Sequence, residues 1–458
     1  MSNAPPRVPD DARVLDGLRE LLLDQAEEMK DALGHRPRIN PLMDIHLLER
    51  RLADDRSQAA TLAKLFLLCE PVAVADAAEA LAPVEIETLA EVGLVAHEED
   101  VARPLAAVTR YDGMLVVSDP LRDPDRLDFV TGTSPSARRV DRLTIRRTAA
   151  RALDLGTGAG TQALRAAGHC DVVVAVDISE RALAFARFNA ALNGLTNIEL
   201  RAGDWFESVA GERFDLIVAN PPYVVSPDSA LLYRDSDLPG DAVTRKLVRE
   251  APGYLEEGGF AHVMGNWIHG RDGDWRGPVE ECLAGSGCDA LLLKYATLDP
   301  VQYAAQWNLL AVAAGAEPFL DNVDRWLDYY RREGIEALSE VMVVLRRRPG
   351  GRNWVRAIEI PGSPTGPAGD HVLRLFEARD RREELNDDET RFALAPGVKM
   401  TRRAKGPKLT EEDTKIELEN GIGFAVSVQA DLVERLASLD PATARRLFAL
   451  GLIVIESR

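Results

Sequence analysis

The segment "ALDLGTGAGTQAL" (residues 152–164) passes from an apolar, strand-like run into a helical pattern through three glycines at alternate positions. Gly156, Gly158 and Gly160 remove three Cβ atoms from this turn, so a ligand can approach bare backbone and the N-terminus of the following helix. A strand, a glycine-rich turn and a helix in this order are typical of nucleotide sites in doubly wound α/β sheets. The segment therefore predicts both the fold class and a nucleotide-like ligand.

The spacing of the glycines indicates which ligand. The dinucleotide fingerprint is G-x-G-x-x-G and places a pyrophosphate at the helix N-terminus. Here the glycines run G-x-G-x-G, with Thr157 between the first two, and Asp154 stands two residues before them. A carboxylate is badly placed beside a pyrophosphate but suits the cationic amino group of S-adenosylmethionine (SAM). A nicotinamide oxidoreductase stays an alternative that this spacing disfavours.

Acidic residues also follow the next two strand-like runs. Asp177 ends "VVVAVD", where its carboxylate is predicted to accept hydrogen bonds from both ribose hydroxyls, and Ile178 to pack on the adenine. Asp204 follows the third run and is predicted to accept from the adenine amino group, with Trp205 covering the ring. Each acid alone could be a helix cap. Together they mark one crevice, because the carboxyl ends of parallel strands meet at one edge of the sheet.

The fourth strand-like run ends in "DLIVANPPYVVSP" (215–227). The Asn220 side-chain oxygen and the Pro221 carbonyl can accept hydrogens from a planar nitrogen and so orient its lone pair, and Asn220 also borders the cofactor. Pro221 and Pro222 fix the backbone of this corner, and Tyr223 can stack on a planar acceptor. The alternative interpretation of the four residues alone is a strand-ending turn.

With "DLGTGAG" and "VANPPY" in place, residues 126–348 resemble the class I SAM-dependent methyltransferases, in the subgroup with the (N/D)-P-P-(Y/F) motif. That subgroup includes methylases of release-factor glutamine, of amines in DNA bases and of guanine in ribosomal RNA. The layout is similar to methyltransferases of actinobacterial type with N- and C-terminal extensions. The resemblance implies SAM as cofactor, S-adenosylhomocysteine as product, no metal, and catalysis at residues 220–223.

The acceptor is expected to lie under the loop that follows the motif. This loop is acidic and contributes Tyr233 and Asp235, which with Tyr223 form the predicted substrate site; its other acids are Asp228, Asp237 and Asp241. Four acids favour a cationic or polar acceptor over a phosphate backbone, although the loop could equally be a solvated acidic segment. The segments 128–137 and 265–270 are further candidates for lining the site, where Phe129, Thr131, Asn266 and Trp267 could contact acceptor or cofactor.

These observations predict an N-methyltransferase that acts on a guanidine or amide nitrogen of a small molecule such as an amino acid, or of a protein side chain. A net charge of −19 disfavours nucleic acid as partner. An exocyclic amine of RNA or DNA stays open as an acceptor, as does a non-catalytic SAM-binding scaffold. The basic stretches at 136–147 and 399–408 are either solvated faces or short grooves, and a basic track leading to Tyr223 would favour nucleic acid.

Three parts are predicted along the chain of 458 residues. Residues 1–125 are mostly helical and end in a hairpin that turns at 112–113, an order found in winged-helix modules, or they form a helical cap. Residues 126–348 form the catalytic domain, a doubly wound Rossmann-like sheet of seven strands. Residues 349–458 form a small α+β extension. The predicted strands are 151–156, 172–178, 198–203, 214–220, 258–265, 289–296 and 340–347.

Composition excludes several other classes. The four cysteines and seven histidines are dispersed without metal-ligand spacing, so neither a disulfide framework nor a metal site is expected. The first residues lack a signal-peptide pattern, and no eighteen apolar residues run together. We therefore expect a cytoplasmic protein.

Overall fold

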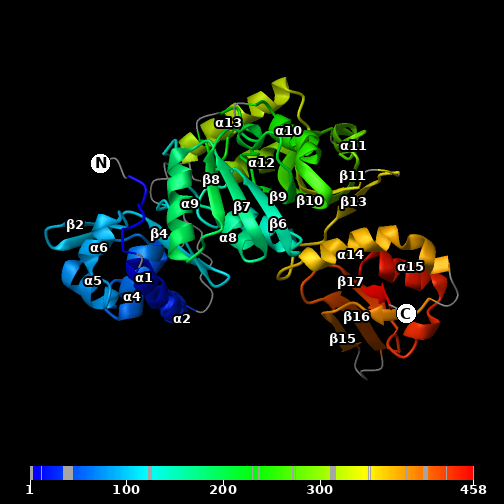
Figure 1. Ribbon diagram of the computed structural model, residues 1–458, viewed down its shortest axis with the longest axis horizontal. Helices are drawn as coiled ribbons and strands as arrows, with labels where there is room; N and C mark the ends of the chain where they lie inside the picture. Colours follow the sequence, from blue (N-terminus) through cyan, green and yellow to red (C-terminus); the bar gives the residue numbers. More distant parts are fainter. Residues whose placement is uncertain are drawn as a thin grey trace.

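The computed structural model describes residues 4–11, 13–34, 45–121, 126–228, 231–235, 238–270, 273, 275–309, 316–348, 350, 352–386, 390–405, 411–429 and 431–456. Figure 1 shows a central α/β unit between an N-terminal, mostly helical unit and a C-terminal α+β unit. The α/β fold expected from the glycine-rich segment is confirmed.

The central unit is a mixed sheet of eight strands in the order β13-β11-β12-β10-β9-β6-β7-β8. β10 pairs in parallel with β9, whereas β12 runs antiparallel to both β10 and β11. The strands are β6 (Ala149–Leu155), β7 (Cys170–Asp177), β8 (Ile198–Ala202), β9 (Phe214–Ala219), β10 (Leu255–His269), β11 (Cys288–Leu298), β12 (Ala337–Arg347) and β13 (Val355–Glu359).

The predicted count of seven strands is wrong by one. All seven predicted segments are strands, but β13 adds an eighth at the edge, where it pairs in parallel with β11. A Pro- and Gly-rich stretch precedes β13, which is why the sequence indicated a boundary at 348. The division of the chain at that residue therefore cuts the sheet.

Both faces of this sheet are buried, as expected when helices cover parallel strands. Leu153 and Leu155 of β6 belong to one apolar cluster, and Ala152 belongs to another on the opposite face. The covering helices are α7 (Pro135–Leu143), α8 (Thr161–Ala167), α9 (Glu180–Leu192), α10 (Ala242–Glu250), α11 (Gly277–Leu283), α12 (Pro300–Trp307) and α13 (Ala316–Arg332). The last two lie between β11 and β12 in the chain.

The N-terminal unit contains a three-stranded sheet of order β1-β3-β2 and a separate β4–β5 hairpin. Its elements are α1 (Arg13–Asp24), α2 (Ala26–Leu33), α3 (Ile45–Leu52), α4 (Gln58–Leu62) with a π-helical turn (Ala63–Leu67), β1 (Val72–Ala73), α5 (Val74–Leu81), α6 (Ile86–Glu91), β2 (Val95–Glu98), β3 (Val101–Pro104), β4 (Ala107–Tyr111) and β5 (Met114–Ser118). The predicted hairpin corresponds to β4–β5. The hairpin that directly follows the last helix of the unit, α6, is instead β2–β3. The winged-helix assignment stays a prediction.

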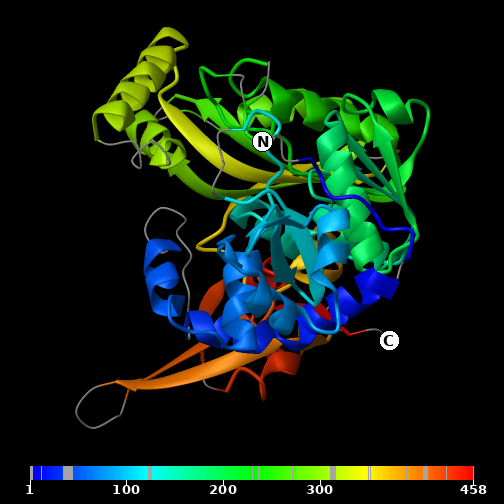
Figure 2. The ribbon, with the colours of Figure 1, turned by 90° about the vertical axis from the view of Figure 1, so that its left-hand side faces the viewer.

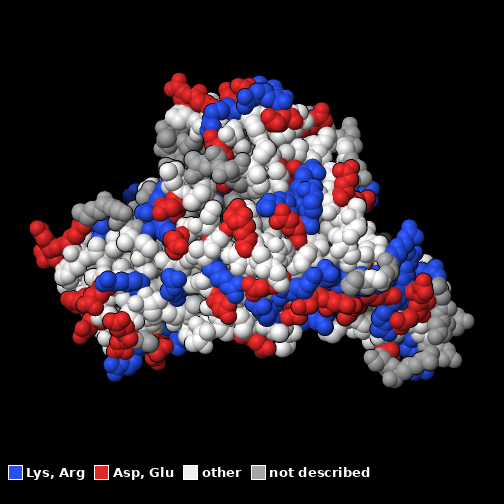
Figure 3. Space-filling view, turned by 45° about the horizontal axis from the view of Figure 1, so that its top comes forward, with Lys and Arg blue, Asp and Glu red and all other residues white. Residues whose placement is uncertain are grey.

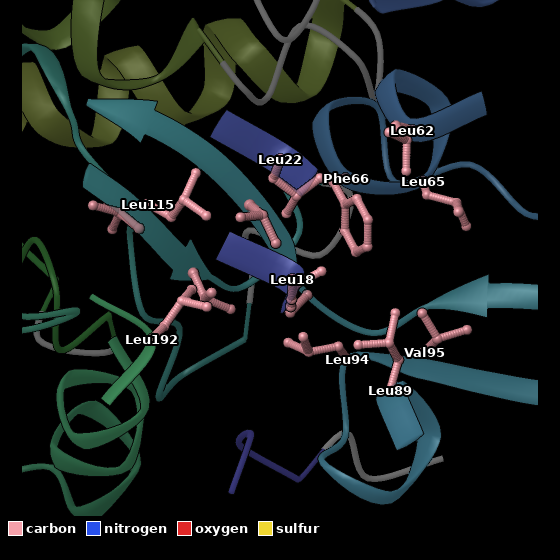
Figure 4. Close-up of a cluster of buried hydrophobic side chains, with 14 of the residues drawn as sticks. Leu18, Leu22, Leu62, Leu65, Phe66, Leu89, Leu94, Val95, Leu115 and Leu192 are labelled. Carbon is pink, nitrogen blue, oxygen red and sulfur yellow. The ribbon is translucent and has the colours of Figure 1, made fainter. Parts of the chain in front are cut away.

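The N-terminal unit shares one apolar core with α8 and α9 of the central unit. Leu18 of α1 and Phe66 belong to the same cluster as Leu115 of β5 and Leu192 of α9 (Figure 4). Phe188 of α9, which is fully buried, belongs to it as well. The division predicted near residue 125 therefore crosses a continuous core.

The C-terminal unit comprises α14 (Gly369–Asp380), β14 (Phe392–Leu394), β15 (Val398–Lys405), β16 (Glu411–Leu418), β17 (Ala425–Val428), α15 (Pro441–Ala449) and β18 (Ile453–Ile455). The β15–β16 hairpin projects from the molecule (Figure 2). α14 attaches the unit to the sheet, since Phe376 contacts Phe260 edge to face at 5.4 Å between ring centres. The basic stretch at 399–408 lies mostly on β15, and its last residues fall outside the described residues.

The shared core predicts the effect of a single truncation. We expect Phe188→Ala to lower the free energy of unfolding by about 3–5 kcal/mol, because it empties a fully buried aromatic site. Urea unfolding followed by circular dichroism should show one shifted transition. Leu320→Ala, at an exposed position of α13, is the control and should change stability by less than about 0.5 kcal/mol. Two transitions, of which only one shifts, would contradict a core shared by both units.

Candidate active site

A cavity of about 440 Å³ opens at the carboxyl ends of β6, β7 and β9. Most of the residues predicted for the site line it, namely Gly156, Thr157, Gly158, Asp177, Ile178, Asp204, Trp205, Asn220, Pro221, Pro222, Tyr223 and Tyr233. The cofactor loop and the Asn-Pro-Pro-Tyr corner therefore face one space. Gly160, Asp154 and Asp235 do not line it.

The cofactor loop, residues 156–160, needs its glycines for two different reasons. Gly156, Gly158 and Gly160 have φ angles of 67°, 56° and 86°, a region that side chains disfavour. A Cβ on Gly156 or Gly158 would meet no atom within 4 Å, so these two positions leave open space for a ligand. A Cβ on Gly160 would lie 3.3 Å from the Cα of Ala186, so this glycine lets α8 and α9 pack closely.

Asp154 supports the loop from below. Its buried carboxylate accepts hydrogen bonds from Thr157 Oγ1 at 2.7 Å and from the Ala163 amide at 2.9 Å. Burial raises the pKa of Asp154 to about 7, although both hydrogen bonds act in the opposite direction. The carboxylate does not line the cavity, and its Oδ2 is bonded within the protein, so direct contact between Asp154 and the cationic amino group of the cofactor stays a prediction.

The second and third strands supply the features expected for a nucleoside. Asp177 accepts hydrogen bonds from the amides of Gly158 (2.8 Å) and Ser179 (2.9 Å), and burial raises its pKa. Ile178 is 66% exposed at the cavity wall, where an apolar side chain is available to a flat ring. Asp204 and Trp205 complete this end. The residues present fit the adenosine part of SAM.

Asn220 leaves one acceptor free. Its Nδ2 lies 3.5 Å from Ser136 Oγ, whereas its Oδ1 is buried and has no partner among the described residues. Buried polar atoms are nearly always satisfied, so an orphaned oxygen in a cavity wall indicates a missing donor. A ligand N–H group would supply it.

Tyr223 is held from several sides. Asn266, which is buried and does not line the cavity, donates to the Tyr223 carbonyl at 3.3 Å. Burial, followed by the nearby charge of Glu340, raises the pKa of Tyr223. Glu340 forms an ion pair with Arg139, whose guanidinium lies 4.3 Å from the centre of the Tyr295 ring.

Arg139 and Glu340 line the cavity but were not among the predicted site residues, whereas Ser136, which also lines it, lies in the candidate segment 128–137. They lie on α7 and β12, and only the fold brings these elements to the motif. Arg139 belongs to the basic stretch 136–147, for which the sequence predicts either a solvated face or a short groove. The candidates Phe129 and Thr131 line the cavity, whereas Trp267 is fully buried in the core.

The acidic loop differs from its predicted role. Asp235 is buried and pairs with Arg234, with 2.8 Å between Nε and Oδ1, so its predicted contact with substrate is wrong. Its neighbours are also paired, Asp228 with Arg325 and Asp241 with Arg245, and neither lines the cavity; Asp237 lies outside the described residues. Each of the three described acids faces an arginine of the protein, so the described part of the loop offers the cavity no free negative charge. Tyr233 does line the cavity, with its ring 5.4 Å from that of Phe129.

Within the described part of the chain, no group of three or more His, Cys, Asp or Glu side chains is arranged to hold a metal ion. In the same residues, no helix combines the length and the apolar character needed to span a bilayer.

Residues 147–259 match the family described as "Methyltransferase domain". This part of the chain is a methyltransferase domain. Residues 15–105 match a family described as "Domain of unknown function (DUF7059)". The expected resemblance to class I SAM-dependent methyltransferases with the Asn-Pro-Pro-Tyr motif is confirmed by this match together with the relatives below.

Two curated relatives match part of the chain. The release factor glutamine methyltransferase of Xylella fastidiosa is 38% identical over 159 residues, which is 32% of this chain and 56% of the relative. The ribosomal protein uL3 glutamine methyltransferase of Xanthomonas campestris is 38% identical over 127 residues, 25% of this chain and 41% of the relative. The chain thus spans about half the length of these relatives. The solved YcgJ protein of Bacillus subtilis is 15% identical with a TM-score of 0.31, covering 47% of this chain and 98% of that one.

The buried Asp154 predicts a pH dependence of stability. Its pKa is raised from an ordinary 3.8 to about 7, so between these pH values the folded protein binds more protons than the unfolded chain. Stability therefore falls as the pH rises through this window. We expect Asp154→Asn to remove this loss, which is on the order of 3 kcal/mol between pH 4 and 7. Urea unfolding of both proteins at several pH values checks it.

The control for this experiment is Asp171→Asn, at an exposed position of β7. Its pH profile of stability should follow that of the wild type. Parallel profiles for the wild type and Asp154→Asn would contradict the prediction.

Proposed function

We propose that the protein is a SAM-dependent N-methyltransferase whose acceptor is the amide nitrogen of a glutamine side chain in another protein. The observation that carries this proposal is the unpartnered, buried Oδ1 of Asn220 in the same cavity as the cofactor loop. An N–H group that satisfies this oxygen lies beside the space available to SAM.

The chain offers matching groups for the cofactor. The open backbone at Gly156 and Gly158 would receive the methionine part, Asp177 would accept from the ribose hydroxyls, and Ile178 and Trp205 would enclose the adenine. When bound, SAM supplies a methyl group on a positively charged sulfur. Asp204 is exposed at the cavity edge, within the part assigned to the adenine.

The Asn-Pro-Pro-Tyr corner would orient the nitrogen. Asn220 Oδ1 and the Pro221 carbonyl each accept one hydrogen of an amide group, which fixes the plane of the group and turns its lone pair toward the methyl carbon. Pro221 and Pro222 hold both acceptors without an ordering cost. Tyr223 lines this end of the cavity. These residues position the nitrogen, and by accepting its hydrogens they increase the electron density on it.

Charge at the acceptor end favours a neutral amide over a guanidinium. The described acids of the loop after the motif are paired with arginines and lie outside the lining. Glu340 lines the acceptor end, but it is bound to Arg139. Among the residues that the structure describes, a cation would find no free counter-charge beside Asn220, whereas an amide needs only hydrogen-bond acceptors.

Two alternatives for the acceptor have less support. For nucleic acid, the helix that precedes the β2–β3 hairpin, α6, would be the expected reading element, yet the exposed residues in it and at its start include Glu85, Glu87 and Glu91. On the face drawn in Figure 3, Lys and Arg are interleaved with Asp and Glu, without a continuous basic track. No contact among the described residues specifically supports a free amino acid or another small molecule as the acceptor. The two relatives reported above are named for protein glutamines.

The direct test is transfer of label from methyl-labelled SAM to three separate pools: proteins, RNA, and free amino acids with metabolites. We expect label in the protein pool, recovered as methylated glutamine after enzymatic digestion and as methylamine after acid hydrolysis. Label confined to RNA or to metabolites would overturn the assignment of the acceptor. Label in no pool, with SAM bound, would favour a non-catalytic SAM-binding scaffold.

A substitution separates positioning from cofactor binding. We expect Asn220→Ala to lower kcat roughly 100-fold or more, because one acceptor for the reacting nitrogen is lost. The Kd for SAM, measured by calorimetry, should stay within about threefold of the wild type. Asn197→Ala is the matched control, since the Asn197 amide donates to the carbonyls of Ala167 and Cys170 (3.1 and 2.9 Å) and does not line the cavity. An unchanged kcat for Asn220→Ala would contradict its proposed role.

A further inference from the structure

The N-terminal hairpin and the cofactor loop meet at one buried side chain. Asn189, on α9, is 0% exposed, and every hydrogen-bonding atom of its amide group is used. Its Oδ1 accepts from the Val117 amide at 2.8 Å, and its Nδ2 donates to the Val117 carbonyl at 2.9 Å. The second Nδ2 hydrogen is donated to the carbonyl of Ala159, in the cofactor loop, at 2.8 Å.

A second asparagine one helical turn later makes the same contact with the hairpin but not with the loop. Asn193 Oδ1 accepts from the Leu115 amide at 3.0 Å, and Nδ2 donates to the Leu115 carbonyl at 2.7 Å. Its other Nδ2 bond goes to the Asn189 carbonyl, within α9 itself. Residues four apart lie on the same helix face, so the two amides together cover the free edge of β5.

The end of β5 also supports the opposite wall of the cavity. Asp119 forms a buried ion pair with Arg181 of α9 and accepts from the Val130 amide at 2.8 Å. Val130 lines the cavity, as does Ala159 on the other side. The hairpin is thus bonded to two walls of the same space, and Asn189 is its direct bond to the cofactor loop.

We propose that Asn189 is a positioning residue for the cofactor loop, and that through it the N-terminal hairpin sets the affinity of the site for SAM. The inference rests on the proposed function, because it assumes that the loop binds SAM. If β5 moves away, the Asn189 amide loses the two bonds that fix its plane, and the Ala159 carbonyl loses its oriented donor. Loop residues 156–160 then lose their fixed position.

The test compares matched variants of the full chain. Asn189→Asp and Asn193→Asp keep the size of the side chain and an acceptor for the β5 amide, but neither aspartate donates to a carbonyl. We expect Asn189→Asp to weaken SAM binding about tenfold, and Asn193→Asp to leave the Kd within about twofold of the wild type, both by calorimetry. Equal Kd values for the two variants would overturn the inference. A wild type that binds no SAM would overturn the proposed function instead.

A measurement on the unaltered protein keeps the inference testable if Asn189→Asp does not fold. Coupling between two sites is reciprocal, so if the hairpin strengthens SAM binding, SAM must strengthen the attachment of the hairpin. We expect saturating SAM to slow hydrogen exchange of the β5 amides, Val117 above all, by about tenfold. Peptides from β2 and β3 serve as the control and should not change. Unchanged exchange in β5 while SAM is bound would overturn the inference.

Discussion

The buried carboxyl group of Asp154 is the constraint on which the site depends. Three glycines in the left-handed region cannot hold a turn by their own side chains, and the hydrogen bonds from Thr157 and Ala163 to one carboxylate oxygen join the loop to the start of α8. Burying an acid without a cation is unfavourable, as its raised pKa shows. The bonds below the loop leave the upper side of Gly156 and Gly158 open to the cavity.

The net charge of the chain says little about the charge at the acceptor. A protein of net charge −19 places four acids just after its acceptor motif, and arginines from two helices and the loop itself neutralise the three described ones. Ion pairs of this kind are structural, because they fix the loop over the helices beneath it. The lining of the cavity includes the paired Arg139 and Glu340, and at Asn220 it presents an acceptor that has no partner among the described residues, which suits a planar neutral group with N–H donors.

The parts of the site that could be predicted from the sequence are those that local patterns mark. The glycine loop, the strand-end residues Asp177 and Asp204, and the Asn-Pro-Pro-Tyr corner each follow a strand directly, and parallel strands bring their ends together. Arg139 and Glu340 lie 81 and 120 positions from Asn220 and have no pattern of their own, so only the packing of α7 and β12 assigns them to the site. Asp235 was misassigned because a side chain next to a motif can turn inward to an adjacent arginine.

The same limit applies to the boundaries of the units. Composition shifts mark loops, and the Pro- and Gly-rich stretch before β13 is a loop, but a loop need not end a domain. Leu115 and Leu192 belong to different predicted domains and pack in one cluster. A domain boundary predicted from composition does not take such contacts into account, because they join residues that are distant in the chain.

Rigidity of the acceptor corner comes from elements that the motif itself does not include. Beyond Tyr223, the chain is fixed at Val225, whose amide donates to the hydroxyl of Tyr303 at 3.1 Å and whose carbonyl accepts from that of Tyr330 at 2.8 Å. Both tyrosines are buried and belong to the helices inserted between β11 and β12. A methyl transfer of the proposed kind relies on holding the nitrogen in line with the methyl group, and small displacements of an acceptor lower the rate steeply. The inserted helices therefore act on the reaction through the backbone of residue 225, although neither tyrosine lines the cavity.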